Sequence, residues 1–298
     1  MKFHHKLLLS LLSAIFLFLS FKELGFFAWF ALVPFLLALY RSSFRQSLFC
    51  SFILGIGFFI GLTYWITELF AKYVWPLIFL FSSIYLVIAG ILIHFTVNRV
   101  SQTYLRIFLI PAAWVIVEFL RSQTFLAFTI GTLGYSQHNF LPLMHLTRFT
   151  GIYGVTFILI LFNTTVFETA IFYMNYRKLN LKFFVIGFSL LLLFVIYGII
   201  SVNRNLDRVI RNKNLTEIKI AAVQPNISFG NKYSGKGFEI IPAPYSGSEY
   251  FMPGTELVIY PESMLWGTVG ENVFFKNWAK ETLKKTFSPT VPQSILSG

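Results

Sequence analysis

Long apolar runs fill the first two-thirds of this sequence and strongly limit what the chain can fold into. A bilayer core of ~30 Å is crossed by about 20 apolar residues in a helix. Seven runs reach or approach that length, and we predict a transmembrane helix for each, although the second and fifth are short enough to be tilted or partly re-entrant. The runs are Leu7–Phe21, Phe26–Tyr40, Leu48–Ile66, Trp75–Val97, Leu105–Leu120, Ile152–Tyr173 and Phe183–Ile200.

The composition changes after Ile200. Across the whole chain 56% of residues are hydrophobic and only 12% are charged, whereas ordinary globular domains are about 45–50% apolar. Charged residues become frequent only beyond residue 200. We therefore predict a membrane domain over 1–200, a linker over 201–216 and the beginning of a soluble domain over 217–298. The basic, apolar start has no small-residue cleavage pattern after Phe21, so we interpret it as a retained first span.

Basic residues in the loops predict the orientation. Most of them fall on the side of the predicted bundle that contains the N-terminus, which is then the cytoplasmic side. Seven spans would place the residues after Ile200 in the periplasm of a bacterial inner membrane. The basic cluster from Arg204 to Lys213 argues for the opposite side, but it leads into a long domain, where the rule weakens. Because the net charge of +12 is spread over these loops, membrane topology explains it and no nucleic-acid partner is expected.

Two short β-rich runs, Ile218–Val223 and Glu256–Tyr260, indicate buried strands of an α/β sheet, and the stretch between them, 228–253, has a loop composition. Glu262 follows the second strand, at the kind of strand end where open α/β sheets bind ligands. A carboxylate there can act as a general base. The alternative is a solvated turn residue.

Glu118 and Arg121 are three residues apart in the fifth run, so a helix puts them on one face. They form either a functional polar pocket or a pair that extends to the lipid headgroups. The stretch 133–150 is expected to be an external loop resting on the bilayer. Trp65 and its aromatic neighbours fit an interfacial belt. The lone cysteine, Cys50, is expected to be a packed thiol, and no histidine has metal-ligand spacing, so we expect neither a metal nor a cofactor.

Several short motifs occur in an order that resembles the apolipoprotein N-acyltransferases of bacterial inner membranes. They are Gly61–Trp65, Pro111–Trp114 leading to Glu118–Arg121, Gly134–Gln137, Thr150–Phe157, Val223–Ile227 and Tyr260–Ser263.

The resemblance implies a helical membrane bundle followed by a nitrilase-like αββα domain. It also implies transfer of an acyl chain from a phospholipid to the N-terminal diacylglyceryl cysteine of an apolipoprotein, through a cysteine thioester. Glu262 would be the general base. Contacts to lipid or substrate would come from Trp65, Glu118, Arg121, Tyr135 and Gln137.

The sequence departs from the family where the catalytic lysine and cysteine are expected, because neither follows Glu262 at the required distance. We therefore expect a truncated, incomplete αββα domain and no turnover by these 298 residues. The alternative is a non-catalytic membrane protein that binds lipid or lipoprotein. A small-solute transporter is a third hypothesis, which the absence of visible half-repeats disfavours.

Overall fold

The computed structural model describes residues 1–69, 73–124, 128–180, 182–211, 218–222, 224 and 256–259. The chain divides into two compact units, Met1–Arg211 and Asn212–Gly298. The last helix of the first unit ends at Arg211. It therefore includes residues 201–211 of the predicted linker over 201–216.

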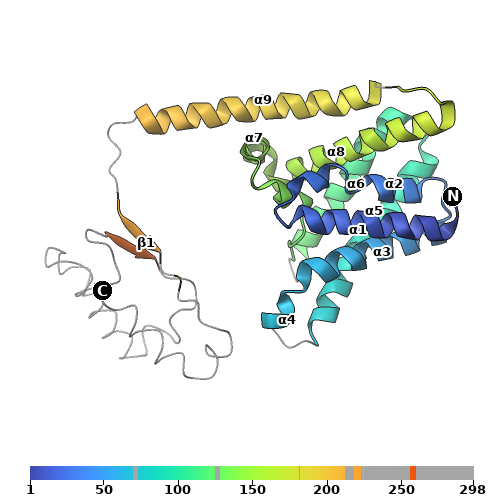
Figure 1. The fold of residues 1–298 in the computed structure, drawn as a ribbon, viewed down its shortest axis with the longest axis horizontal. Helices are drawn as coiled ribbons and strands as arrows, with labels where there is room; N and C mark the ends of the chain where they lie inside the picture. The colour runs from blue at the N-terminus through green and yellow to red at the C-terminus, as the bar shows by residue number, and fades with distance from the viewer. Residues whose placement is uncertain are drawn as a thin grey trace. The chain divides into compact units, whose positions relative to one another are not determined.

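The first unit is a helical bundle (Figure 1). Within the described residues, six helices are long and apolar enough to cross a membrane. They are α1 (Phe3–Ser20), α3 (Phe44–Thr63), α5 (Trp75–Arg99), α6 (Thr103–Gln123), α8 (Thr147–Tyr176) and α9 (Lys182–Arg211), the last of these over Gly187–Arg204. The short elements are η1 (Gly25–Trp29), α2 (Val33–Leu39), α4 (Ile66–Leu69), η2 (Leu133–Gln137) and α7 (Leu141–Met144).

The two short predicted spans have different outcomes. The fifth is the continuous helix α6, which has 21 residues and contains the buried Pro111. The second is not one helix, because it divides into the 3₁₀ helix η1 and the seven-residue helix α2.

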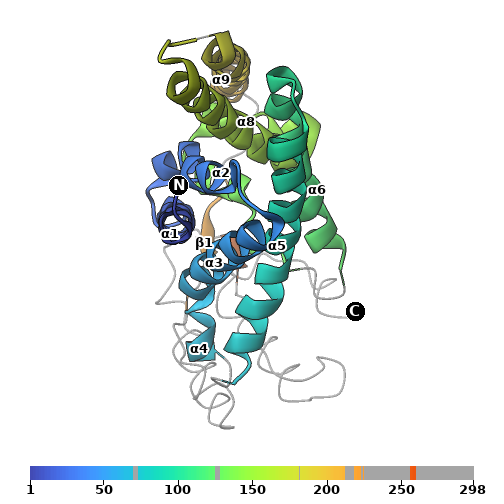
Figure 2. The same ribbon diagram turned by 90° about the vertical axis from the view of Figure 1, so that its right-hand side faces the viewer.

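The divided segment forms the centre of the bundle. α2 contacts α1, α3, α5 and α8, and Figure 2 shows it enclosed by them. Leu32, Phe35, Leu36 and Leu39 have no exposed surface. Irregular backbone at membrane depth is tolerated where protein surrounds it and satisfies its hydrogen bonds. Hydropathy alone did not separate this protein-buried segment from a lipid-facing span.

Side chains satisfy the backbone groups that the break leaves free. Asn163 of α8 accepts a hydrogen bond from the amide of Leu32 at 2.9 Å and donates one to the carbonyl of Ala28 at 2.9 Å. Pro34 lies in the first turn of α2, and the Ser13 hydroxyl accepts from the free amide of Phe35 at 2.8 Å. Polar residues inside apolar helices therefore stabilise the non-helical stretch.

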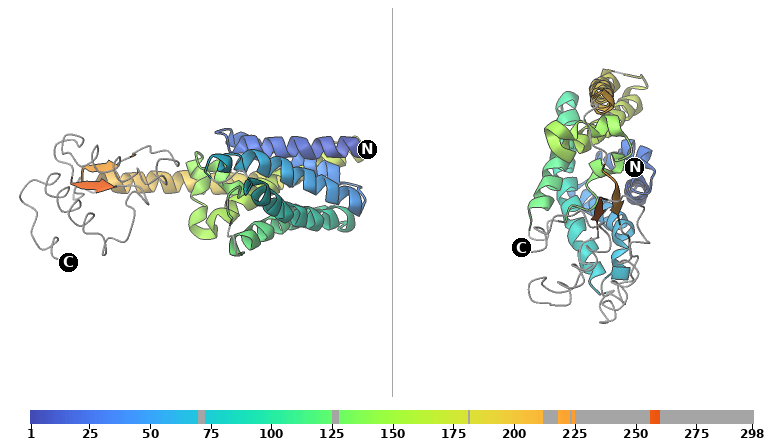
Figure 3. Two further views of the ribbon diagram at one scale, coloured as in Figure 1. Left: turned by 90° about the horizontal axis from the view of Figure 1, so that it is seen from below. Right: turned by 90° about the vertical axis from the view of Figure 1, so that its left-hand side faces the viewer.

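The two ends of the bundle differ in their polar contacts. At the end where the chain begins, which we call the basic end, buried Lys6 donates to the carbonyl of Arg41 and to Gln46. α1 leads away from this end and η1 with α2 returns to it, and the left view of Figure 3 shows α1 and α3 side by side. The opposite end, which we call the exit end, contains η1, η2 and α7. The Ser201 hydroxyl of α9 contacts His145 Nδ1 there at 3.0 Å.

The stretch 133–150 is not wholly an external loop. Its first five residues form η2, in which Leu133, Gly134, Ser136 and Gln137 are buried, so that expectation is wrong for them. The stretch then reaches α8, whose regular part begins after Gly151. Gly151 has a φ of 62°, in the left-handed region that favours glycine.

The second unit contains a two-stranded parallel sheet within its described residues. β1 (Ile220–Ala222) pairs with β2 (Leu257–Ile259), with Ile220 opposite Leu257 and Ala222 opposite Ile259. Both predicted strands are present in shortened form and pair in parallel, but the expectation that they are buried is wrong for Ile220, Leu257 and Ile259, which are about half exposed. Glu262 lies outside the described residues.

Candidate functional site

Glu118 of α6 is the centre of a buried polar cluster at the exit end. Its side chain is 4% exposed and its carboxylate accepts three hydrogen bonds. The Trp114 indole donates to Oε1 at 2.9 Å, the Leu133 amide donates to Oε1 at 2.9 Å, and the Thr156 hydroxyl donates to Oε2 at 3.0 Å. Because these donors come from α6, η2 and α8, one carboxylate joins three elements.

The geometry of each donor follows from local structure. Trp114 lies one turn before Glu118 on the same helix face. Leu133 is the first residue of η2, where a helical amide has no partner within its own helix. The Thr156 hydroxyl also accepts from the amide of Gly134 at 2.9 Å, so α8 satisfies the next free amide of η2. We call Trp114, Glu118, Arg121, Thr132, Leu133, Gly134 and Thr156 the Glu118 cluster.

Arg121 is buried in the same cluster but has fewer partners. It is 2% exposed, its Nη2 donates to the Thr132 hydroxyl at 3.3 Å, and its guanidinium carbon lies 5.4 Å from the centre of the Phe59 ring. Its Nε has no hydrogen-bond partner within the described part of the chain. The two charges share one helix face as predicted, and neither reaches solvent. Burial excludes the snorkelling alternative for both.

A small hollow lies beside these two charges, between α5 and α6. Tyr85, Leu86 and Ala89 of α5 and Trp114, Val117, Glu118 and Arg121 of α6 line it. It has room for about one water molecule. The charged groups therefore border a small, partly polar space within an otherwise apolar helix interface.

Gln137 is committed to contacts within the protein. Its side-chain oxygen accepts from the Trp29 indole at 3.1 Å, and its nitrogen donates to the Gly25 carbonyl at 2.8 Å and to the Ser136 hydroxyl at 2.9 Å. These contacts attach η1 to η2. In this arrangement Gln137 can position the exit end but has few remaining groups for a ligand.

Trp65 and Tyr135 lie at the surface of the exit end. They are 48% and 49% exposed, and neither side chain makes a hydrogen bond or ring contact in the described residues. Tyr135 is held by η2, in which its neighbours Gly134 and Ser136 are buried. Trp65 follows α3, at the turn into α4. The five predicted contact residues are thus two buried charges, one buried amide and two exposed aromatic rings.

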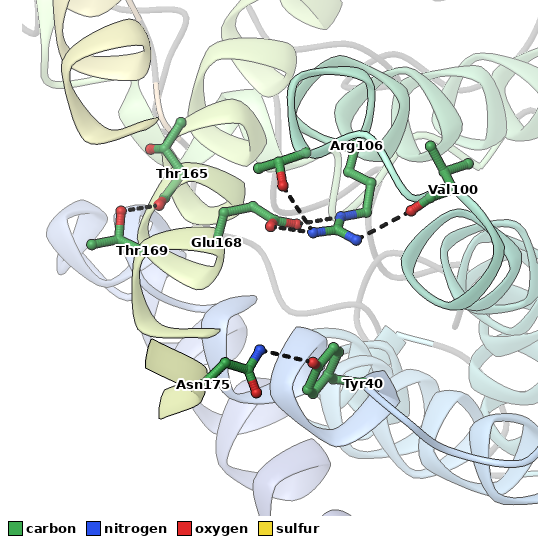
Figure 4. A network of polar contacts seen from close by, with 8 residues as sticks. Tyr40, Val100, Arg106, Thr165, Glu168, Thr169 and Asn175 are labelled. Carbon is green, nitrogen blue, oxygen red and sulfur yellow. Dashed lines mark hydrogen bonds and ion pairs between the residues drawn. The ribbon is translucent and has the colours of Figure 1, made fainter. Parts of the chain in front are cut away.

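A second charged site lies at the basic end and was missed by the sequence reasoning. Glu168 of α8 accepts hydrogen bonds from Arg106 Nε at 2.7 Å and from Arg106 Nη2 at 2.5 Å (Figure 4). Arg106 also donates to the Val100 carbonyl at 3.1 Å and to Thr103 at 3.2 Å. Arg106 and Glu118 are 12 positions apart, which is about 18 Å along α6. Arg106 and Glu168 lie in the predicted runs Leu105–Leu120 and Ile152–Tyr173, and a carboxylate within an apolar run is a signal for a buried partner.

Cys50 is buried in the first half of α3, towards the basic end. Serine, lysine and glutamine side chains of α1 and α3 surround this part of the bundle. It is the one cysteine of the 298 residues, and the Glu118 cluster lies at the other end.

These features define a multi-pass membrane protein with a buried carboxylate–guanidinium site at the end of its helical bundle, followed by a second unit whose described residues include a two-stranded parallel sheet. The family model described as "Apolipoprotein N-acyltransferase N-terminal domain" matches residues 13–165, which include the whole Glu118 cluster. The chain belongs to the apolipoprotein N-acyltransferase family.

Three curated relatives illustrate the similarity. The apolipoprotein N-acyltransferase of Geobacter metallireducens is 31% identical over 172 residues, which are 54% of this chain and 33% of the relative. Apolipoprotein N-acyltransferase 1 of Treponema denticola is 27% identical over 278 residues, covering 86% of this chain and 48% of the relative. The Chlorobaculum tepidum enzyme is 26% identical over 268 residues, 86% and 49% respectively. The chain spans half the length or less of each of these relatives.

Proposed function

We propose that this chain provides the membrane bundle and the beginning of the nitrilase-like domain of an apolipoprotein N-acyltransferase. The reaction moves an acyl chain from a phospholipid to the α-amino group of a diacylglyceryl cysteine at the N-terminus of an apolipoprotein. The Glu118 cluster supports this proposal most directly, because it connects segments that carry the family's motifs at one end of the bundle.

The bundle would hold the phospholipid donor with its headgroup at the exit end. Glu118 fixes the positions of α6, η2 and α8, and Gln137 fixes η1 against η2. Exposed Trp65 and Tyr135 would then contact lipid or lipopeptide, since aromatic rings of this kind favour the membrane–water interface. The exit end would face the periplasm, as the excess of basic loop residues at the other end predicts.

Glu262 would be the general base of the soluble domain, which would have the nitrilase-like αββα fold. In the family reaction a base removes the thiol proton, and the thiolate displaces a lysophospholipid to give an acyl thioester. The α-amine of the acceptor then displaces the thiolate and leaves an amide. Cys50 would not serve as this thiol, because it is buried in α3 towards the basic end.

Deletion of the gene for this chain tests the proposal. If the gene product completes lipoprotein maturation, mass spectrometry of lipoprotein N-termini should show two acyl chains and a free α-amine in the deletion strain and three acyl chains in the parent. The wild-type gene should restore the third chain and Glu262→Gln should not. Unchanged triacylation after deletion would overturn the enzymatic proposal.

A second candidate is lipid or lipoprotein binding without acyl transfer. The burial of the one cysteine of the 298 residues favours it for these residues taken alone. Purified chain 1–298 should then retain phospholipid and form no hydroxylamine-sensitive acyl label. Appearance of such a label would exclude this second candidate.

A further inference from the structure

The buried charges of the Glu118 cluster are unequally satisfied. Both carboxylate oxygens of Glu118 are hydrogen-bonded, through three donors. A guanidinium carries five N–H donors, and within the described residues Arg121 uses one of them, in a long bond of 3.3 Å to Thr132. Buried polar groups are usually hydrogen-bonded, and one that has no partner within the described part of the chain calls for another, such as water, an ion or a ligand.

The ion pair between Arg106 and Glu168 shows how a buried arginine of this bundle is hydrogen-bonded on several of its N–H donors. Arg106 makes two bonds to Glu168 and two more to a carbonyl and a hydroxyl. Arg121 is more deeply buried than Arg106, at 2% against 14% for the Arg106 side chain, yet its Nε has no partner among the described residues. The unused donors of Arg121 therefore match an external acceptor that carries negative charge.

The location of the hollow indicates where that acceptor comes from. Arg121 and Tyr85 both line it. On each helix exposed apolar side chains precede lining residues directly in the sequence: Ile84 and Ile88 on α5 and Leu120 on α6. Such side chains face the acyl chains in a membrane, so a lipid that lies against α5 and α6 has its polar part within reach of the hollow. Arg121 lies in the last turn of α6, where a headgroup rather than an acyl chain is expected.

We infer that Arg121 binds an anionic phosphate oxygen of a phospholipid that docks between α5 and α6 at the exit end. The hollow takes the oxygen rather than the whole headgroup, since its volume is about that of one water molecule. Glu118 is a positioning residue: it accepts a hydrogen bond from the Leu133 amide and so holds η2 next to Thr132, whose hydroxyl accepts from Arg121. This inference rests on the proposed function in that it names the part of the donor lipid that the bundle recognises.

Native mass spectrometry of chain 1–298 in detergent tests the inference. The probes are phosphatidylglycerol, the phosphate-free diacylglycerol with the same acyl chains, and inorganic phosphate. The wild-type chain should retain phosphatidylglycerol at least tenfold better than diacylglycerol, and Arg121→Gln should abolish this preference. Arg148→Gln is the matched control, because Arg148 is an exposed arginine near the same end of the bundle.

Each other outcome has a defined meaning. Equal retention of the two lipids, or a preference that persists in Arg121→Gln, would overturn the inference. Displacement of phosphatidylglycerol by millimolar inorganic phosphate would assign the site to a free anion and overturn the lipid assignment. If Arg121→Gln does not fold, Arg121→Lys keeps the charge but loses the fork of donors, and its preference should fall without disappearing.

The inference and the proposed function can fail independently. Intact triacylation in the deletion strain combined with a phosphate preference lost in Arg121→Gln would overturn only the enzymatic proposal. Loss of triacylation in the deletion strain, combined with a preference for phosphatidylglycerol that persists in Arg121→Gln, would overturn only the headgroup site.

Discussion

Replacing Arg106 with methionine should destabilise the bundle by about 4 kcal/mol, because the change leaves the Glu168 carboxylate buried without its partner. Removal of one member of a buried ion pair typically costs about 3–5 kcal/mol. Glu168 is 2% exposed and its oxygens take the Nε and Nη2 donors of Arg106 at 2.7 and 2.5 Å. The methionine also loses the bonds to the Val100 carbonyl and Thr103.

The opposite single change should be milder. Glu168→Leu leaves Arg106 with its bonds to Val100 and Thr103, and the Arg106 side chain is 14% exposed, so water reaches part of it. A loss of about 1.5–3 kcal/mol is expected, which is the usual range for a hydrogen bond to a charged group. In the double variant Arg106→Met, Glu168→Leu no charge remains buried, and its loss should be smaller than that of Arg106→Met alone.

Denaturant unfolding in detergent micelles, followed by circular dichroism, measures these free energies. The double-mutant cycle should give a coupling energy of about 2–3 kcal/mol. Additive single effects would refute the reasoning, because they would mean that the two side chains do not satisfy each other. A greater loss for Glu168→Leu than for Arg106→Met would also contradict it.

Three further changes test other parts of the structure by the same unfolding assay. Asn163→Ala should cost about 2–4 kcal/mol, because it leaves one backbone amide and one carbonyl of the divided central segment without partners; an effect below 1 kcal/mol would contradict this role. Thr156→Val keeps the side-chain shape but removes the donor to Glu118 and the acceptor of the Gly134 amide, and should cost about 1–3 kcal/mol; in a Glu118→Leu background the cost should be smaller, because only the bond to Gly134 is then lost. Gly151→Ala should cost about 1–3 kcal/mol through its backbone conformation alone (φ 62°, ψ −170°), since nothing lies within 4 Å of the added methyl group, and Gly151→Asn should cost as much, because this conformation is open essentially to glycine only.

The apolar runs were a sound guide to the long helices because a membrane-crossing helix needs length and low polarity, both of which are local properties. The second run is the exception. Residues 25–39 are as apolar as a lipid-facing span, yet α2 is enclosed by four other helices and divided from η1. Asn163, more than a hundred residues away, hydrogen-bonds one amide and one carbonyl of this segment, and no local pattern in 25–39 could predict that contact.

The candidate site was predictable only in part for the same reason. Spacing along one helix correctly placed Glu118 and Arg121 on a common face. Two partners of Glu118 lie in η2 and α8, 15 and 38 residues further along the chain. Their contacts with Glu118 depend on how the helices pack. The assignment of Gln137 as a contact residue came from the family resemblance, and its structural partners in η1 became visible only in the folded chain.

Photo-crosslinking of the full chain in bilayers with a phospholipid that carries a diazirine on its headgroup is the most direct test of the account. Peptide mapping should place the cross-links on α5 and α6 around Tyr85 and Arg121, with a large decrease in Arg121→Gln and none in Arg148→Gln. Cross-links spread evenly over the exposed faces of the helices, or confined to the basic end, would show that the Glu118 cluster does not recognise a phospholipid headgroup.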